Sequence, residues 1–148
     1  MKPLLIIGLG NPLMGDDSAG LRVSDLLASD SAVTNAADVI AGGTDLLSSM
    51  DRIEGRTRVI LVDAVESLSD PGRISVIEGP LLEERAEYVH SLSAAQAVEL
   101  MRQVMPGLQG TRFTWVLVHV ASARVLQQMS PEVAAVVPLA AAVVKGLL

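Results

Sequence analysis

The fold is decided by residues 4–17, which read LLIIGLGNPLMGDD. Four consecutive aliphatic residues precede Gly8, and an unalternating apolar run of this kind is typical of a strand buried on both faces of a sheet. A glycine-containing loop follows, and either Asp16 or Asp17 is expected to cap the helix that begins there. The stretch therefore predicts a buried strand, a tight turn and a helix, which together form the first unit of an α/β fold.

The same alternation of strands and helices continues along the chain. We expect further strands at residues 37–41, 59–62, 73–77 and 113–120, and helices at 44–50, 93–105 and from 131 onward. Ser93 opens a capping box, and Ser130 is expected to cap the last helix. Because the strands are solidly apolar, the pattern predicts a mostly parallel sheet with helices on both faces. The sequence contains no linker or repeat, so a single domain, 1–148, is expected.

The composition excludes several classes of protein. Half of the 148 residues are apolar, the formal net charge is −6, and the 11 basic residues are scattered, which argues against nucleic-acid binding. The chain has no cysteine, which rules out disulfides, thiolate zinc sites and cysteine nucleophiles. The first apolar run is too short for a signal peptide, and the last falls short of the roughly 20 residues of a membrane span. We therefore expect a cytoplasmic protein with no membrane partner.

Polar residues stand where the predicted parallel strands end. They are Asn11, Asp16 and Asp17 after the first strand, Gly42, Gly43 and Thr44 after the second, and Asp63 after the third. In an open parallel sheet, ligands bind outside the carboxyl ends of the strands near the switch point of the topology. The aspartates could simply cap loops and helices, but an aspartate at the mouth of a buried strand is costly unless a metal or cationic group compensates it.

The two histidines have different prospects. His90 stands at the entrance of a predicted helix, whose positive end favours the neutral imidazole that a metal needs, although an ordinary exposed loop residue is an equal alternative. His119 lies within a predicted strand, where a packed sheet residue is more common than a ligand. Two carboxylates and one imidazole suit a borderline metal ion. A metal-free acid and base pair, Asp17 with Asp63, is the alternative.

The glycine loop does not fit a nucleotide-binding motif well. The dinucleotide fingerprint would need glycine at Leu13 and an acidic residue where Ala41 stands, and no Gly-Lys-Ser/Thr follows the loop. A tight turn that lets the helix pack closely on the sheet is the favoured interpretation. A nucleotide-binding domain remains a third, weaker hypothesis.

Residues 6–20, IIGLGNPLMGDDSAG, resemble the opening signature of the hydrogenase maturation endopeptidases. Gly42-Gly43-Thr44, residues 61–65 with Pro71-Gly72, His90-Ser91 and residues 130–133 are similar to the later boxes of that family, in the same order. The resemblance implies a three-layer α/β/α sandwich with a twisted, mostly parallel five-stranded sheet. It also implies an endopeptidase that removes a C-terminal extension from the nickel-loaded precursor of a nickel-iron hydrogenase large subunit.

By this resemblance, Asp17, Asp63 and His90 are the catalytic and metal-contacting residues. They would contact nickel supplied by the substrate, and no organic cofactor is implied. Supporting roles in the loops or toward the substrate fall to Asn11, Asp16, Gly42, Gly43 and Thr44. We expect a monomer whose partner is the hydrogenase precursor.

The sequence departs from the family pattern at three places. The last strand usually leads into a glycine-containing turn, whereas this chain has His119-Val120-Ala121-Ser122 there. Family members often carry aspartate before Gly-Gly-Thr, where this chain has Ala41, and glycine after the acidic pair, where it has Ser18. The alternative function is therefore a non-catalytic, metal-recognising or chaperone-like module that docks on a nickel protein, with activity lost through changes such as Ala41.

Overall fold

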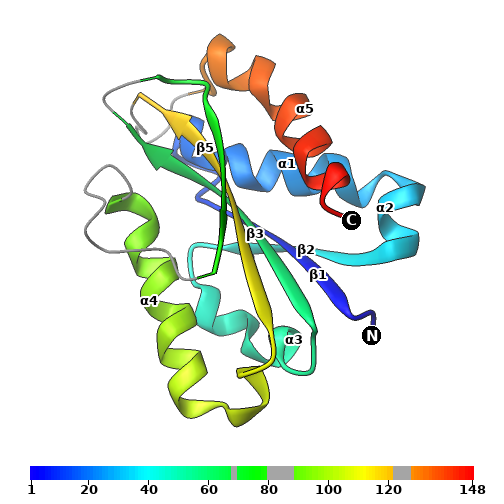
Figure 1. Ribbon diagram of the computed structural model, residues 1–148. Coiled ribbons are helices and arrows are strands. Elements are labelled where there is room, and N and C mark those ends of the chain that lie inside the picture. The colour runs from blue at the N-terminus through cyan, green and yellow to red at the C-terminus, as the bar shows by residue number, and fades with distance from the viewer. Residues whose placement is uncertain (68–69, 80–88, 122–127) are drawn as a thin grey trace.

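A computed structural model describes residues 1–67, 70–79, 89–121 and 128–148, without the side chains of 89–93. Within these residues, one sheet has the strand order β2-β1-β3-β5-β4 (Figure 1). The strands are β1 (Leu4–Leu9), β2 (Ala37–Gly43), β3 (Arg58–Glu66), β4 (Ile74–Glu78) and β5 (Arg112–Val120). All neighbouring strands are parallel except β4, which runs antiparallel to β5 at the edge. The predicted mostly parallel five-stranded sheet is confirmed.

Helices cover both faces of this sheet, as the apolar strands predict (Figure 1). On one face lie α1 (Ala19–Ala28), α2 (Ser31–Ala36) and α5 (Pro131–Gly146); on the other lie the 3₁₀ turn η2 (Leu46–Ser49), α3 (Met50–Ile53), α4 (Val89–Val104) and η4 (Pro106–Leu108). Alternate residues of β3 enter two separate aliphatic cores: Leu61 packs toward α4, whereas Ile60 packs toward α1 and α5. This arrangement is the predicted three-layer α/β/α sandwich.

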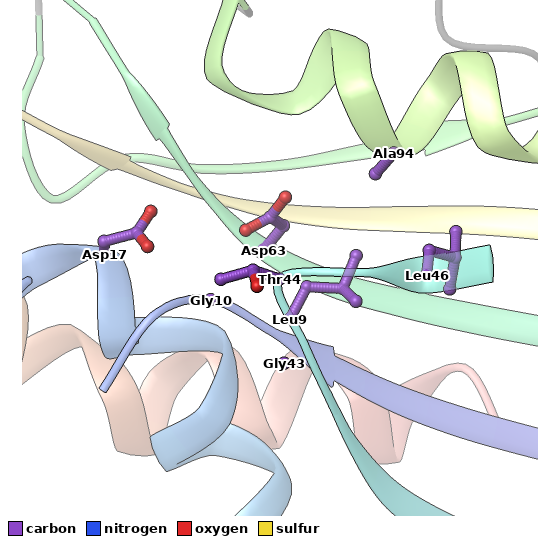
Figure 2. Close-up of a pocket in the computed structure, with 8 residues that line it drawn as sticks. All are labelled: Leu9, Gly10, Asp17, Gly43, Thr44, Leu46, Asp63 and Ala94. Carbon is purple, nitrogen blue, oxygen red and sulfur yellow. The ribbon is translucent and has the colours of Figure 1, made fainter. Parts of the chain in front are cut away.

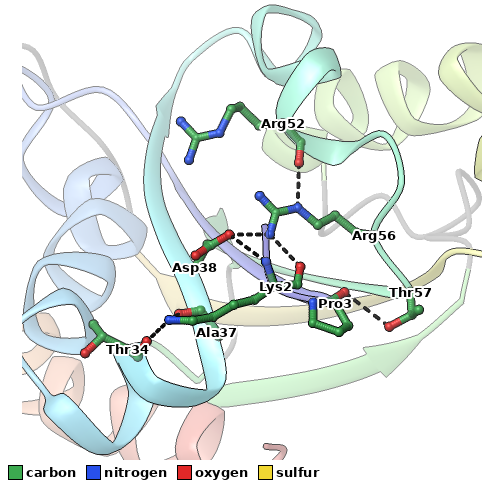
Figure 3. Close-up of polar contacts among 8 residues, drawn as sticks. All are labelled: Lys2, Pro3, Thr34, Ala37, Asp38, Arg52, Arg56 and Thr57. Atoms are coloured by element: carbon green, nitrogen blue, oxygen red, sulfur yellow. Dashed lines mark hydrogen bonds and ion pairs between the residues drawn. The ribbon is translucent and has the colours of Figure 1, made fainter.

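A buried arginine ties the amino-terminal ends of β1 and β2 together (Figure 3). Arg56 is only 4% exposed; its Nε donates to the Arg52 carbonyl at 2.9 Å and its guanidinium donates to the Lys2 carbonyl at 2.6 Å. The guanidinium also forms an ion pair with the Asp38 carboxylate. These contacts lie at the end of the sheet opposite the polar strand ends, so they stabilise the scaffold away from the candidate site.

Several boundaries differ from the sequence-based expectation, and two of these differences concern residues with a predicted role. Asp63 lies inside β3, because β5 continues to pair with β3 as far as Glu66, whereas β1 stops pairing with it at Val62. The helix predicted at 93–105 begins instead at Val89. Ser93 therefore lies inside α4 and does not cap it, since a cap satisfies backbone groups only at a helix end. None of the described helices is long and apolar enough to span a lipid bilayer.

Candidate active site

The site lies where the sheet topology changes direction. From β1 the chain moves to β2 on one side and then to β3 on the other, so the connections separate above the carboxyl ends of β1 and β3. A cavity of about 240 Å³ opens there (Figure 2). It is lined by Leu9, Gly10, Asp17, Gly43, Thr44, Leu46, Asp63 and Ala94. Four residues predicted from strand ends thus meet in one pocket.

The loop after β1 holds Asp17 at the pocket by backbone contacts. Asp17 is 1% exposed, and its Oδ2 accepts a hydrogen bond from the Asn11 amide at 2.7 Å. The Asn11 side chain accepts from the Leu13 amide at 2.9 Å, which tightens the turn. Gly10 has a φ of 140°, and a Cβ there would overlap the Asp17 carbonyl oxygen. Asn11 therefore stabilises the turn that carries Asp17, and only glycine fits at Gly10.

The acidic pair is divided between two directions. Asp16 is 8% exposed, and it accepts two hydrogen bonds from Ser130, from the amide at 2.6 Å and from the hydroxyl at 2.9 Å. Ser130 is the N-cap of α5, as predicted, so Asp16 joins the first loop to the last helix. The expectation that an aspartate caps α1 is wrong. Both aspartates lie in the 3₁₀ turn η1 (Gly15–Ser18), and the N-cap residue of α1, Ser18, makes no side-chain capping bond.

Asp63 reaches the pocket from the middle of β3. It is 4% exposed, lies on the α4 side of the sheet, and its Oδ1 accepts from the Ala64 amide at 2.8 Å. The Asp63 side chain lines the pocket because β1 no longer pairs with β3 at this position. Figure 2 shows the carboxylates of Asp17 and Asp63 directed into the same space. Two buried carboxylates in one pocket can bind a cation, or can position and deprotonate a water molecule.

The two histidines lie in different surroundings. His119 is completely buried in β5; its Nε2 lies 2.8 Å from the Ser75 hydroxyl and 3.4 Å from the Arg73 guanidinium, and it does not line the pocket. Its interpretation as a packed sheet residue is confirmed. His90 is the second residue of α4, four positions before Ala94, and its side chain is outside the described part of the structure. Among the side chains that are described, no group of three or more His, Cys, Asp or Glu residues could hold a metal.

Only two residues of the segment Gly42-Gly43-Thr44 line the pocket. Gly43 and Thr44 line the pocket, whereas a Cβ at Gly42 would meet the side chains of Ile7 and Leu9. Gly42 therefore serves close packing. Ala41 is exposed and is not one of the pocket residues, so this departure from the family pattern leaves the carboxylate pair untouched.

Three apolar lining residues, Leu9, Leu46 and Ala94, were not predicted. In the sequence they cannot be told apart from the core aliphatic residues, because only their position at the end of the sheet gives them a role.

Residues 21–146 match the HycI family, described as hydrogenase maturation proteases. The chain belongs to the hydrogenase maturation protease family. The family resemblance read from residues 6–20 and the later boxes is thereby confirmed, including membership of a peptidase family.

Solved structures agree with this membership. HybD, a [NiFe] hydrogenase maturation protease from Thermococcus kodakarensis, is 27% identical with a TM-score of 0.83, over 99% of each chain. A hydrogenase 2 maturation peptidase from Thaumarchaeota archaeon SCGC_AB-539-E09 is 28% identical with a TM-score of 0.70, over 97% of this chain and 96% of that one. The endopeptidase HybD from E. coli, at 23% identity, shares the fold with a TM-score of 0.79, over 100% of this chain and 92% of that one. A comparison with curated proteins found no match.

Proposed function

We propose that this hydrogenase maturation protease removes a C-terminal extension from the nickel-loaded precursor of a nickel-iron hydrogenase large subunit. The observation that carries the proposal is the pocket in which Asp17 and Asp63 meet, because it places two buried carboxylates at the switch point of a protease fold. The proposal includes a monomer that acts in the cytoplasm, which sedimentation and cell fractionation would test.

In this proposal, nickel belongs to the substrate and is recognised by Asp17, Asp63 and His90. Carboxylate and imidazole groups suit a divalent ion of intermediate softness. His90 joins the set by position, since residues four apart lie on the same face of a helix and Ala94 of α4 lines the pocket. A neutral imidazole is favoured in the first turn of a helix, where the backbone dipoles are positive. No organic cofactor is required.

The proposed chemistry is hydrolysis by a water molecule that the carboxylates position. One carboxylate accepts the proton as the water oxygen attacks the carbonyl carbon of the scissile peptide bond, which is general base catalysis. The nitrogen that leaves then takes up a proton, so that one water molecule is consumed for each bond cut. The apolar lining residues Leu9 and Leu46 keep bulk water away from the carboxylates, which strengthens their interaction with a bound cation.

Substitutions at the three proposed residues test the proposal, and at the two aspartates asparagine keeps the shape while removing the charge. Asp17→Asn, Asp63→Asn and His90→Ala are each expected to leave the fold intact and to abolish the mass change of the precursor. Asp51→Asn is the matched control, because Asp51 is an exposed aspartate of α3 outside the pocket. Circular dichroism and urea unfolding would verify that each variant is folded. Full processing of the nickel-loaded precursor by Asp63→Asn would refute the assignment, and precursor binding by the wild type without any cleavage would favour the non-catalytic alternative.

A further inference from the structure

A second cavity continues the carboxylate pocket along the protein surface. Its volume is about 250 Å³, and it lies between the segment that leads into η2 and the helix α4. Three residues, Thr44, Leu46 and Ala94, line both this cavity and the pocket that contains Asp17 and Asp63. The two cavities therefore share a wall and are continuous. We call the second cavity, which is lined by Asp45, Leu47, Gln96, Ala97 and Leu100 in addition to the three shared residues, the η2–α4 groove.

The η2–α4 groove has a largely aliphatic lining, with Asp45 and Gln96 as its polar residues apart from Thr44. Leu47 on the η2 side is 38% exposed, and Leu100 on the α4 side is 47% exposed. Ala94 and Ala97 of α4 also line the groove, and their short side chains leave space for it. Partly exposed leucines that line one hollow next to a candidate active site are typical of a surface that binds an apolar partner.

The length of the groove corresponds to a short piece of extended chain. Ala94 and Leu100 are six residues apart on α4, and at about 1.5 Å per residue this is about 9 Å. An extended polypeptide advances about 3.3 Å per residue, so the groove accommodates about three residues.

The substrate of a protease is a polypeptide, so the chain on either side of the cut bond must leave the pocket along the surface. We propose that the η2–α4 groove binds an extended segment of the precursor next to the cut bond, with an apolar side chain seated between Leu47 and Leu100. This inference rests on the proposed function. The groove is favoured over the hollow between α1 and α5 that contains Leu26, because that hollow shares no residue with the carboxylate pocket.

Steady-state processing kinetics test the groove. The double variant Leu47→Ala, Leu100→Ala is expected to raise KM for the nickel-loaded precursor about tenfold with kcat nearly unchanged, because each leucine would bury its now exposed part in the complex. Leu26→Ala is the matched control, since Leu26 is a helix leucine with the same 47% exposure in the other hollow. It is expected to leave KM unchanged. An unchanged KM in the double variant, or an equal rise in the control, would overturn the groove while leaving the proposed function standing.

A crosslinking measurement and a binding measurement test the groove separately from the proposed proteolytic function. A photoreactive benzoylphenylalanine at position 100 is expected to crosslink to the precursor within a few residues of the cut, and crosslinks confined to distant segments would contradict the groove. If the wild type cleaves no precursor, the proposed function fails. Fluorescence anisotropy with a synthetic peptide that spans the end of the precursor then tests whether the groove binds the precursor. Weaker peptide binding by the double variant supports the proposed groove, and equal binding rejects it.

Discussion

The contact between Asp16 and Ser130 offers the sharpest test of how the site is held. Asp16 directly precedes the pocket residue Asp17, yet its own carboxylate points to the first residue before α5, 114 positions along the chain. Replacing Asp16 by alanine removes the acceptor for both the Ser130 amide and the Ser130 hydroxyl. It also weakens the cap, because the Ser130 hydroxyl accepts from the Val133 amide at 3.4 Å.

The expected loss of stability follows from these bonds. A hydrogen bond to a charged group contributes about 1.5–3 kcal/mol. The two bonds share one carboxylate, and Ser130 is half-buried, so water recovers part of the loss. We therefore expect Asp16→Ala to lower the free energy of unfolding by about 2–3 kcal/mol. Ser130→Ala removes the hydroxyl and the cap but keeps the amide donor, so we expect a loss of about 1 kcal/mol.

Urea unfolding of the wild type, the two single variants and the double variant measures this coupling. Because both residues belong to one contact, the double variant is expected to lose less than the sum of the single losses, by about 1 kcal/mol. Asp25→Ala, at an exposed position of α1, is the control and should change stability by less than about 0.5 kcal/mol. A loss below about 0.5 kcal/mol for Asp16→Ala, or strictly additive losses, would refute the reasoning.

Two further predictions concern the scaffold. Arg56→Met should lower the free energy of unfolding by about 2 kcal/mol near pH 6, because it leaves Asp38 without its buried cation. The hydrogen bond from Arg56 lowers the pKa of the Asp38 carboxyl below its ordinary value of 3.8, so the pair stabilises the fold above that value and its contribution is lost as the pH falls further. The gap in urea midpoint between wild type and variant should thus narrow from pH 6 to pH 3, and a constant gap would contradict this assignment. Gly20→Ala should destabilise the protein although alanine is the better helix former, because a Cβ there would overlap backbone carbonyl oxygens of β1 and β3. Gly146→Ala, which meets open space at the end of α5, should be neutral or stabilising in the same thermal melt, and equal effects at the two glycines would disprove the packing argument.

The carboxylate pocket shows how a shared sheet edge assembles a site from distant segments. Asp17 is held by a turn in which the Asn11 amide donates to its carboxylate. Asp63 is held by the central strand β3, which at this position still pairs with β5 but no longer with β1. Both side chains are therefore positioned by hydrogen-bonded backbone structure, as the proposed catalytic role of the pair requires.

The sequence by itself determined the five strands and the layers of this protein. The aliphatic runs at 4–7 and 59–62 can bury both of their faces only in a sheet covered on both sides, so the α/β/α class follows from local pattern alone. The same logic placed Asp17, Gly43, Thr44 and Asp63 at one edge of the sheet, because the carboxyl ends of parallel strands meet there.

Only the tertiary structure decided how the acidic pair is divided and how the pocket continues. Asp16 turns to Ser130 because α5 packs beside α1, and no local signal connects positions 114 residues apart. Asp63 became a residue within a strand because β5 pairs beyond it while β1 does not. Leu47 and Leu100 resemble core leucines in the sequence, and only the packing of α4 against η2 leaves both of them partly exposed along one groove. Local pattern fixes which face of an element is apolar, whereas the partner of that face depends on contacts between segments far apart in the chain.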